Sequence, residues 1–207
     1  MSTAPPPMPP AGELLPAIIP ANSIFVRVHQ VGKDALWFGP VPGDPPAYRF
    51  DAPSGQFRTL YGAERIEGAF AETILRRARR IIARDYVEQR QWSLIRTLRD
   101  LKLAKLFDNG LIWHGVTADI AAGDDYRASQ AFAADLHAAH ADCDGIAYRA
   151  RHNNGEICYA LFDRVGSAHL LVLDSRHFRN ERTITEDLMR AHNASWDPMT
   201  PLPPPPP

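Results

Sequence analysis

The sequence predicts an α+β fold, in which helices flank a β-sheet within one folded domain. The chain has 207 residues, a length that suits one domain with tails. Hydrophobic residues make up 45% of the chain and charged residues 23%, which is enough apolar material to bury a core. Strand-like and helix-like segments follow one another without regular alternation. That order favours α+β over a repeated βαβ arrangement.

Proline marks the ends of the folded part. Of 19 prolines, seven lie within residues 1–20, seven within 198–207, and five between Pro40 and Pro53. Prolines at this density favour extended chain with polyproline II character over packed structure. A proline-rich end is also a possible ligand for an SH3-like groove. The sequence therefore predicts four parts: a disordered tail (1–21), a folded domain (22–180), a C-terminal helix (181–197) and a second disordered tail (198–207).

Seven short segments are predicted to form strands, because they are rich in β-branched and aromatic residues or are bounded by turn residues. They are residues 23–29, 59–61, 91–98, 101–107, 145–149, 157–162 and 169–173. Residues 151–155 join two of these strands as a predicted hairpin, with Asn154 and Gly155 in the turn.

Three segments show the helical spacing of apolar residues, namely 66–83, 129–140 and 185–192. In the first of them the predicted buried stripe consists of Ile66, Phe70, Ile74 and Ile81. Residues 31–53 contain many Gly, Pro and Asp residues, which predicts a long loop. Loops of this length are usually functional or disordered, and the aromatic residues in this one favour order.

Charge and cysteine content exclude several classes of protein. The chain carries 23 basic and 24 acidic side chains, so bulk charge does not favour nucleic-acid or membrane-surface binding. Its two cysteines, Cys143 and Cys158, match no zinc spacing and indicate reduced thiols. No apolar run has the roughly 20 residues that span a bilayer, and the N-terminus lacks the pattern of a secretory signal. A cytoplasmic location is expected.

Glu72 is the first candidate for chemistry. On a helix it lies beside Gly68 and Ala69, so small residues surround an acid that a ligand can approach. Gly68 is unfavourable within a helix by roughly 1 kcal/mol, which indicates close packing of a ligand or of backbone there. The alternative is an exposed Glu72 that pairs with Arg76 one turn later.

Arginines supply the second set of candidates. Arg27 lies on the first predicted strand, and its forked guanidinium suits a pyrophosphate, although an edge-strand arginine in solvent fits the pattern as well. Arg49 allows the same two interpretations, with Asp51 as a possible local partner. Five arginines between Arg76 and Arg84 predict either a solvated helix face or a partner-binding patch. His137 and His140 have no third ligand at convincing spacing, so no metal site is predicted.

Several segments together resemble the RES domain, which is named for its Arg, Glu and Ser residues. They are FVRVHQ, LWFGP, YRFDAPSGQFRTLYGAERIEGAFAETILR, DYRASQAFAADLH and DGIAYRARHNNGEICYALFDR. The resemblance implies an ADP-ribosyltransferase-like split β-sheet core with flanking helices. It also implies an enzyme that consumes NAD as a substrate, needs no cofactor, and serves as the toxin of a toxin–antitoxin pair. The implied protein partner is a helix-turn-helix antitoxin.

By the same resemblance, Arg27, Tyr61 and Glu72 match the family's catalytic arginine, tyrosine and glutamate. Arg49, Tyr48, Ser129 and Arg151 are expected to bind substrate. The chain departs from the family at Ala150, where a serine is common. This leaves three functions open: cleavage of the nicotinamide–ribose bond with water or phosphate as acceptor, protein ADP-ribosylation, and a weakened or inactive domain that binds a partner.

Overall fold

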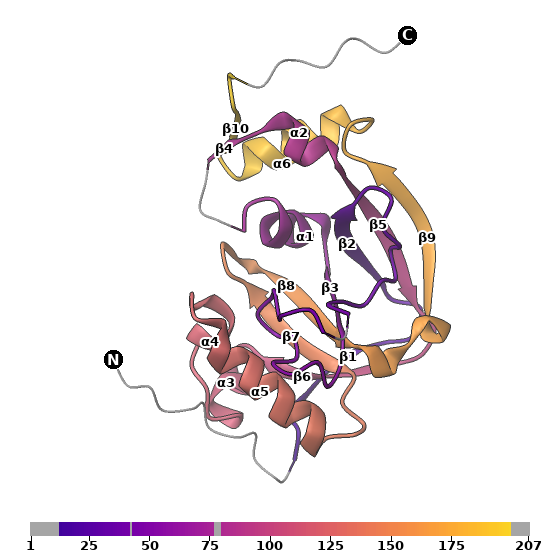
Figure 1. Ribbon diagram of the computed structural model, residues 1–207, viewed down its shortest axis with the longest axis vertical. Coiled ribbons are helices and arrows are strands. Elements are labelled where there is room, and N and C mark those ends of the chain that lie inside the picture. The colour runs from indigo at the N-terminus through magenta and orange to yellow at the C-terminus, as the bar shows by residue number, and fades with distance from the viewer. Residues whose placement is uncertain (1–12, 42, 77–79, 200–207) are drawn as a thin grey trace.

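The computed structural model describes residues 13–41, 43–76 and 80–199. Its main feature is an eight-stranded mixed sheet with the strand order β1-β6-β7-β8-β3-β2-β5-β9 (Figure 1). These strands are β1 (Pro16–Ile19), β2 (Ile24–Gln30), β3 (Thr59–Ala63), β5 (Arg90–Thr97), β6 (Leu101–Leu106), β7 (Gly145–Ala150), β8 (Asn153–Phe162) and β9 (Leu170–His177). Helices flank the sheet, which confirms the predicted α+β class.

The sheet is split between β2 and β3. Strand β2 pairs with β5 at all seven of its residues, and β3 pairs with β8 at all five of its residues. Between β2 and β3, however, the only registered pair is Val26 with Ala63. The strands therefore touch at one point and separate on either side of it. This confirms the split sheet that the resemblance implied.

Helix α1 (Ile66–Thr73) connects the two halves, because it packs against β2 and β3 as well as against β7 and β8. In Figure 1 it lies between the group β2, β5 and β9 and the group β6, β7 and β8. Phe70 of α1 is fully buried, and Ile74 at the C-terminal end of the helix is nearly so. These two residues anchor α1 as the apolar spacing predicted.

The other helices lie at the two ends of the molecule (Figure 1). Helices α3 (Asn109–Trp113), α4 (Asp119–Ala122) and α5 (Tyr126–Ala139) lie beside β6 and β7. At the other end, α2 (Arg84–Glu88) and α6 (Arg182–Ala191) accompany a small parallel sheet of β4 (Ile81–Ile82) and β10 (Ser195–Trp196). The C-terminal helix was predicted over 181–197, but α6 ends at Ala191, because Ser195 and Trp196 pair with β4 as strand β10.

The first predicted helix is too long. It ends at Thr73 instead of residue 83, and Ile81 is 61% exposed instead of buried. Ile81 and Ile82 belong to β4, which pairs with Ser195 and Trp196. A partner more than a hundred residues away overrides the local helical pattern here. Part of the predicted arginine face, Arg77 and Arg79, falls on residues 77–79, outside the described ranges.

Two further expectations are wrong. The N-terminal tail was predicted to be disordered to residue 21, but β1 pairs with β6, with Pro16 opposite Ala104. Proline is tolerated there because it is the first residue of an edge strand. The turn between β7 and β8 is formed by Arg151 and His152, and Asn154 and Gly155 are already part of β8. A register shift at the end of β7 moves the turn.

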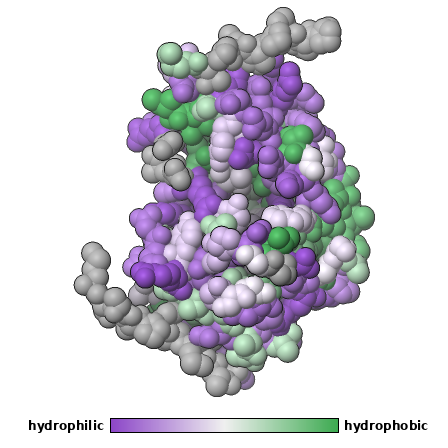
Figure 2. Space-filling model, viewed as in Figure 1, coloured by the Kyte–Doolittle hydropathy of each residue, from purple (hydrophilic) through white to green (hydrophobic). Residues whose placement is uncertain are grey.

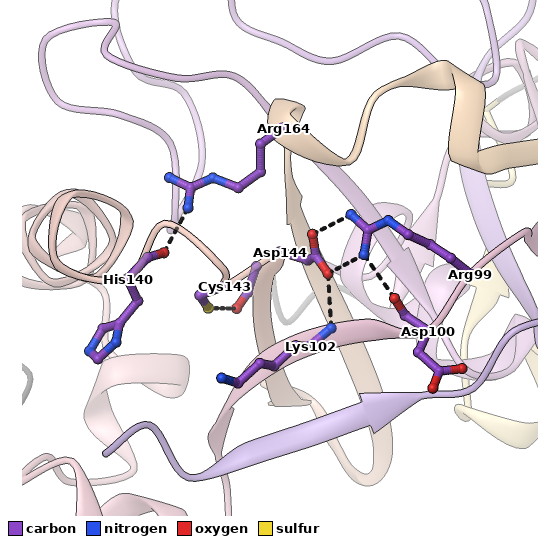
Figure 3. A network of polar contacts seen from close by, with 8 residues as sticks. Arg99, Asp100, Lys102, His140, Cys143, Asp144 and Arg164 are labelled. Carbon is purple, nitrogen blue, oxygen red and sulfur yellow. Dashed lines mark hydrogen bonds and ion pairs between the residues drawn. The ribbon is translucent and has the colours of Figure 1, made fainter. Parts of the chain in front are cut away.

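A buried carboxylate holds the start of β7 in place (Figure 3). Asp144 receives two hydrogen bonds from the guanidinium of Arg99, at 2.7 and 2.6 Å, and one from the backbone N–H of Lys102 at 2.9 Å. Nearby, Arg164 donates to the carbonyl oxygens of His137 and His140 at the C-terminal end of α5. A cation is favourable at that end because the last carbonyls of a helix have no partners within it.

The molecular face in Figure 2 is mainly hydrophilic, and its apolar residues form separate patches. Among the large apolar side chains of the described residues, Ile112 and Met199 are the most exposed, at 87% each. Every helix in the described ranges falls short of the length and apolar character that a membrane crossing requires.

Gly68 is expected to be required for the packing of α1 on the sheet. A Cβ atom at Gly68 would lie 2.9 Å from Cβ of Glu156 and 3.1 Å from Cβ of Ala63. Gly68→Ala should therefore lower the free energy of unfolding by about 1–3 kcal/mol, although alanine favours a helix by about 1 kcal/mol. Denaturant unfolding measures this change.

The control is Ala128→Gly on the exposed side of α5. That variant should lose about 1 kcal/mol through helix propensity alone. A Gly68→Ala protein that is more stable than the wild type would contradict the packing argument.

Candidate functional site

A cavity of about 380 Å³ lies at the split between β2 and β3. Side chains of β2, β3 and α1 line it, together with the loop before β3 and the β7–β8 turn. Six of the seven predicted site residues contribute to its wall: Arg27, Tyr48, Arg49, Tyr61, Glu72 and Arg151. The structure thus brings together an acid and several cations that lie far apart in the sequence.

Glu72 is held at the last turn of α1, facing the β7–β8 turn. Its Oε1 accepts a hydrogen bond from the backbone N–H of Arg151 at 2.7 Å, and its Oε2 lies 3.5 Å from the hydroxyl of Tyr148. Burial, and then the charge of Glu72, raise the pKa of Tyr148 well above its usual value, so this hydroxyl keeps its proton. Glu72 therefore faces the cavity and is not the exposed partner of Arg76.

Arg27 lies inside the sheet and not at its edge. Strand β2 has neighbours on both sides, and only 8% of Arg27 is exposed. Its Nη1 has no hydrogen-bond partner among the described residues. Burial lowers the pKa of Arg27 to about 10, and the carboxylate of Asp34 offsets part of that shift. At neutral pH the guanidinium is still charged, and it faces a cavity with its hydrogen bonding incomplete.

Arg49 is buried as well, but its partner is not Asp51. It donates to the carbonyl oxygen of Gly123 at 2.8 Å, and its guanidinium lies 4.7 Å from the ring centre of Tyr126. Arg151 forms an ion pair with Asp124 at 2.7 Å in the same connection between α4 and α5. Two cations of the wall are therefore fixed by one short segment.

Asp51 instead organises the loop that carries Tyr48. One of its oxygens accepts from the backbone N–H groups of Ala47 and Tyr48, at 2.9 and 2.7 Å, and the other accepts from the hydroxyl of Tyr61 at 2.9 Å. The Tyr61 hydroxyl also accepts from the N–H of Phe50. The hydroxyl of Tyr61 is thus already hydrogen-bonded within the protein, so Tyr61 contacts the cavity mainly through its aromatic ring.

Arg76 is a site residue that the sequence pattern missed. Its guanidinium lies 4.4 Å from the ring centre of Tyr48 and donates to the hydroxyl of Tyr126 at 3.3 Å. The predicted long helix placed it on a solvated face, but α1 ends three residues earlier and Arg76 turns into the cavity wall. Nothing in the local spacing indicated this.

Tyr126 was missed for a different reason. Helix α5 begins at Tyr126, three residues before the predicted start. The side chain of Asp125 caps it by accepting from the N–H of Arg127 at 3.0 Å. An aspartate before a helical pattern is a known start signal, so the sequence did contain the information.

Ser129 does not line the cavity. It is 1% exposed, and its hydroxyl donates to the backbone carbonyl of Tyr126 at 3.0 Å. The expected contact between Ser129 and substrate therefore has no counterpart in the described structure. Ala150 is also fully buried, in the apolar cluster that contains Tyr148 and Phe50. The position where the family commonly has a serine thus lies behind the wall.

The charge of the wall is strongly unbalanced. Among the described residues it contains one carboxylate, that of Glu72, and six cationic side chains: Arg27, Lys33, Arg49, Arg76, Arg90 and Arg151. Tyrosine and tryptophan rings lie between these groups. Such a wall suits an anionic ligand that carries planar rings. Within the described ranges, no group of three or more His, Cys, Asp or Glu side chains is arranged to hold a metal ion.

Protonation of His29 should make stability depend on pH. Burial, and then the charge of Arg27, lower the pKa of His29 to about 4, whereas an unfolded histidine titrates near 6.5. Between these values the unfolded chain holds a proton that the folded chain lacks. The free energy of unfolding should therefore fall as the pH decreases from 6.5 to 4, by up to about 1.4 kcal/mol per pH unit from this residue.

Urea unfolding at a series of pH values measures the slope, which should be smaller in His29→Asn. The control His169→Gln changes an exposed histidine outside the cavity and should keep the wild-type slope. Equal slopes in all three proteins would show that His29 titrates normally.

Comparison with known proteins identifies the family and supports the fold. The profile of the RES domain matches residues 24–182. A solved chain of similar fold belongs to the crystal structure of the M. tuberculosis MbcT–MbcA toxin–antitoxin complex. It is 20% identical, with a TM-score of 0.62, and the match covers 86% of this chain and 92% of that one. No curated protein sequence matches. Since the profile spans most of the sequence, this chain belongs to the RES domain family.

Proposed function

We propose that the protein consumes NAD by cleaving the bond between nicotinamide and ribose. The observation that carries the proposal is that Arg27 and Glu72 line one cavity, together with five further cations and several aromatic rings. A dinucleotide combines the groups that such a wall recognises, namely a diphosphate and two planar bases. The cavity volume of about 380 Å³ falls in the range of small-molecule sites.

Glu72 stabilises the reacting sugar in this proposal. Cleavage of the nicotinamide–ribose bond releases a neutral leaving group and leaves positive charge on the ribose, as in glycoside cleavage. A carboxylate fixed beside that carbon lowers the energy of the transition state. The fixed position of Glu72 supports this role, because its carboxylate accepts from the N–H of Arg151 and lies 3.5 Å from the hydroxyl of Tyr148.

Arg27 binds the diphosphate, since a buried guanidinium without a partner gains hydrogen bonds when an anion arrives. Arg49 and Arg76 add positive charge, and each also packs on a tyrosine ring. Tyr61 borders the cavity with its ring, which suits contact with nicotinamide. The proposed reaction needs no cofactor, because nicotinamide leaves as a neutral molecule and no electrons are transferred to another group.

The acceptor decides the type of reaction: water makes the enzyme a glycohydrolase, phosphate a phosphorylase, and a protein side chain a transferase. We propose water or phosphate as the acceptor, with protein ADP-ribosylation as the alternative. Incubation with NAD, followed by identification of the products by mass, separates the three reactions.

We further propose that the protein is the toxin of a toxin–antitoxin pair in the cytoplasm. The support is its family membership and the similar fold of a chain from a toxin–antitoxin complex. The implied partner is a helix-turn-helix antitoxin. The two cysteines are free and buried, which is compatible with a reducing compartment.

Glu72→Gln should lower the rate of NAD consumption by a factor on the order of 10²–10³, because it removes the charge that opposes the developing cation. NAD binding should change much less, since the glutamine keeps the shape of the side chain. Single-turnover kinetics and calorimetry measure the two effects.

The matched control is Glu67→Gln on the same helix but outside the cavity wall, which should behave as the wild type. If Glu72→Gln consumes NAD at the wild-type rate, the proposed chemistry is wrong.

Ala150→Ser tests the departure from the family pattern. If a serine hydroxyl orients Tyr148 or the adjacent turn, restoring it should raise kcat/KM for NAD roughly two- to tenfold, the value of one neutral hydrogen bond. A fall in activity together with a fall in melting temperature would show instead that the fully buried position no longer tolerates a hydroxyl.

A further inference from the structure

His29 lies next to Arg27 on the working face of β2 and also has an unsatisfied polar atom. The two residues are two positions apart on one strand, so their side chains leave the same face of the sheet. Both line the cavity, and they are only 8% and 6% exposed. Arg27 Nη1 and His29 Nδ1 are buried without a hydrogen-bond partner in the described part of the chain.

Two unsatisfied buried groups at one place are costly. Each buried polar atom without a partner costs free energy unless a ligand or an ordered water satisfies it. Since both atoms belong to side chains that line the cavity, a bound ligand can remove both costs together. Their position therefore indicates a binding site for one ligand group.

The other ring nitrogen of His29 is fixed by a chain of two serines. His29 Nε2 lies 2.8 Å from the hydroxyl of Ser93, which lies 2.7 Å from the hydroxyl of Ser175. Ser93 on β5 is paired with Arg27, and Ser175 on β9 is paired with Ser93, so the three residues form one row across the sheet. Ser93 is fully buried, whereas Ser175 is exposed, so the chain leads from the cavity to solvent.

The direction of these hydrogen bonds decides what Nδ1 offers. If Ser175 donates to Ser93 and Ser93 donates to Nε2, then the proton of a neutral imidazole lies on Nδ1. If the chain runs the other way, Nδ1 is an acceptor. The surroundings favour a donor, because the cations Arg27, Lys33 and Arg90 line the same wall. The carboxylate of Asp34, which accepts from the N–H of Leu36, is not part of the cavity lining. A ligand drawn to these cations is an anion, which needs donors.

We propose that His29 is a further binding residue of the site, and that its Nδ1–H donates to the same anionic oxygen group that Arg27 binds. Ser93 and Ser175 act through His29 as positioning residues, because they fix its tautomer. This inference rests on the proposed function, because it identifies the anion with the diphosphate of the dinucleotide. His29 thus contributes a neutral hydrogen-bond donor beside the cationic side chains of the wall.

The tautomer is measured directly. Nitrogen-15 spectra of the imidazole rings distinguish Nδ1–H from Nε2–H, and the spectrum of His29→Gln assigns the His29 signals among the eight histidines. At pH 7 the wild type, saturated with inorganic pyrophosphate, should show the Nδ1–H form. Ser93→Ala should show a mixture of the two forms. An Nε2–H form in the complex would overturn the proposal.

Binding measurements test the contact itself. In His29→Gln the side-chain amide lies near the position of the imidazole Nε2 and keeps the contact to Ser93. In His29→Asn the amide lies near the position of Nδ1, which is the proposed donor to the anion. His29→Gln should therefore weaken the binding of inorganic pyrophosphate and of ADP roughly tenfold or more, the value of a hydrogen bond to a charged group. His29→Asn should weaken it by less than about threefold.

His169→Gln serves as the matched control and should bind as the wild type does. Equal losses in His29→Gln and His29→Asn, or none in either, would overturn the proposal. Pyrophosphate binding requires no bond cleavage, so this outcome is separate from that of the proposed function. A protein that binds pyrophosphate through His29 but leaves NAD intact would refute the chemistry and keep the binding residue.

Discussion

The single paired position between β2 and β3 is the constraint on which the site depends. A sheet that is paired throughout offers only its two faces to a ligand. In this sheet a cavity lies between two adjacent strands, β2 and β3, where their edges are not paired. Val26 and Ala63 keep the halves in contact, and α1 packs across both. Each strand is fully paired with its other neighbour, so both stay anchored although their facing edges share one registered pair. The cavity is therefore formed by the fold itself.

The opening concentrates positive charge at some energetic cost. Several guanidinium groups line one small volume with a single carboxylate among the described residues. Like charges repel, and burial removes water from Arg27 and Arg49. Tyrosine rings and carbonyl oxygens offset part of this cost at Arg49 and Arg76. In the proposed function, the diphosphate of the bound dinucleotide offsets the rest of this cost.

The walls are fixed by groups that do not face the ligand. Asp51 ties the loop before β3 to Tyr61, and Gly123 and Asp124 tie down Arg49 and Arg151. Farther away, Asp144 and Arg164 anchor β7 and the end of α5 (Figure 3). These contacts are distributed over loops and strand ends, where the site residues are found. A site of this kind is preorganised by many small restraints and not by one rigid element.

The strand segments could be predicted from residue type, because β-branched and aromatic residues gather where the sheet is buried. The residue pattern also identified Arg27, Arg49 and Glu72 as candidates, and the family resemblance added Tyr61. It failed where a distant partner decided the local structure. Ile81 leaves the expected helix because β10 pairs with it. Ser129 has a local reason instead, since its hydroxyl donates to the carbonyl of Tyr126 within the same helix.

By itself, then, the sequence determined the class of the fold, most of its strands and the chemical types of the reacting groups. These depend on composition and on spacing along the chain. Only the tertiary structure decided that Arg76, Tyr126 and His29 belong to the site, and that Ser129 does not. Membership depends on where β2 and β3 separate, and that point is set by the pairing of Val26 with Ala63, which lie more than thirty residues apart in the sequence.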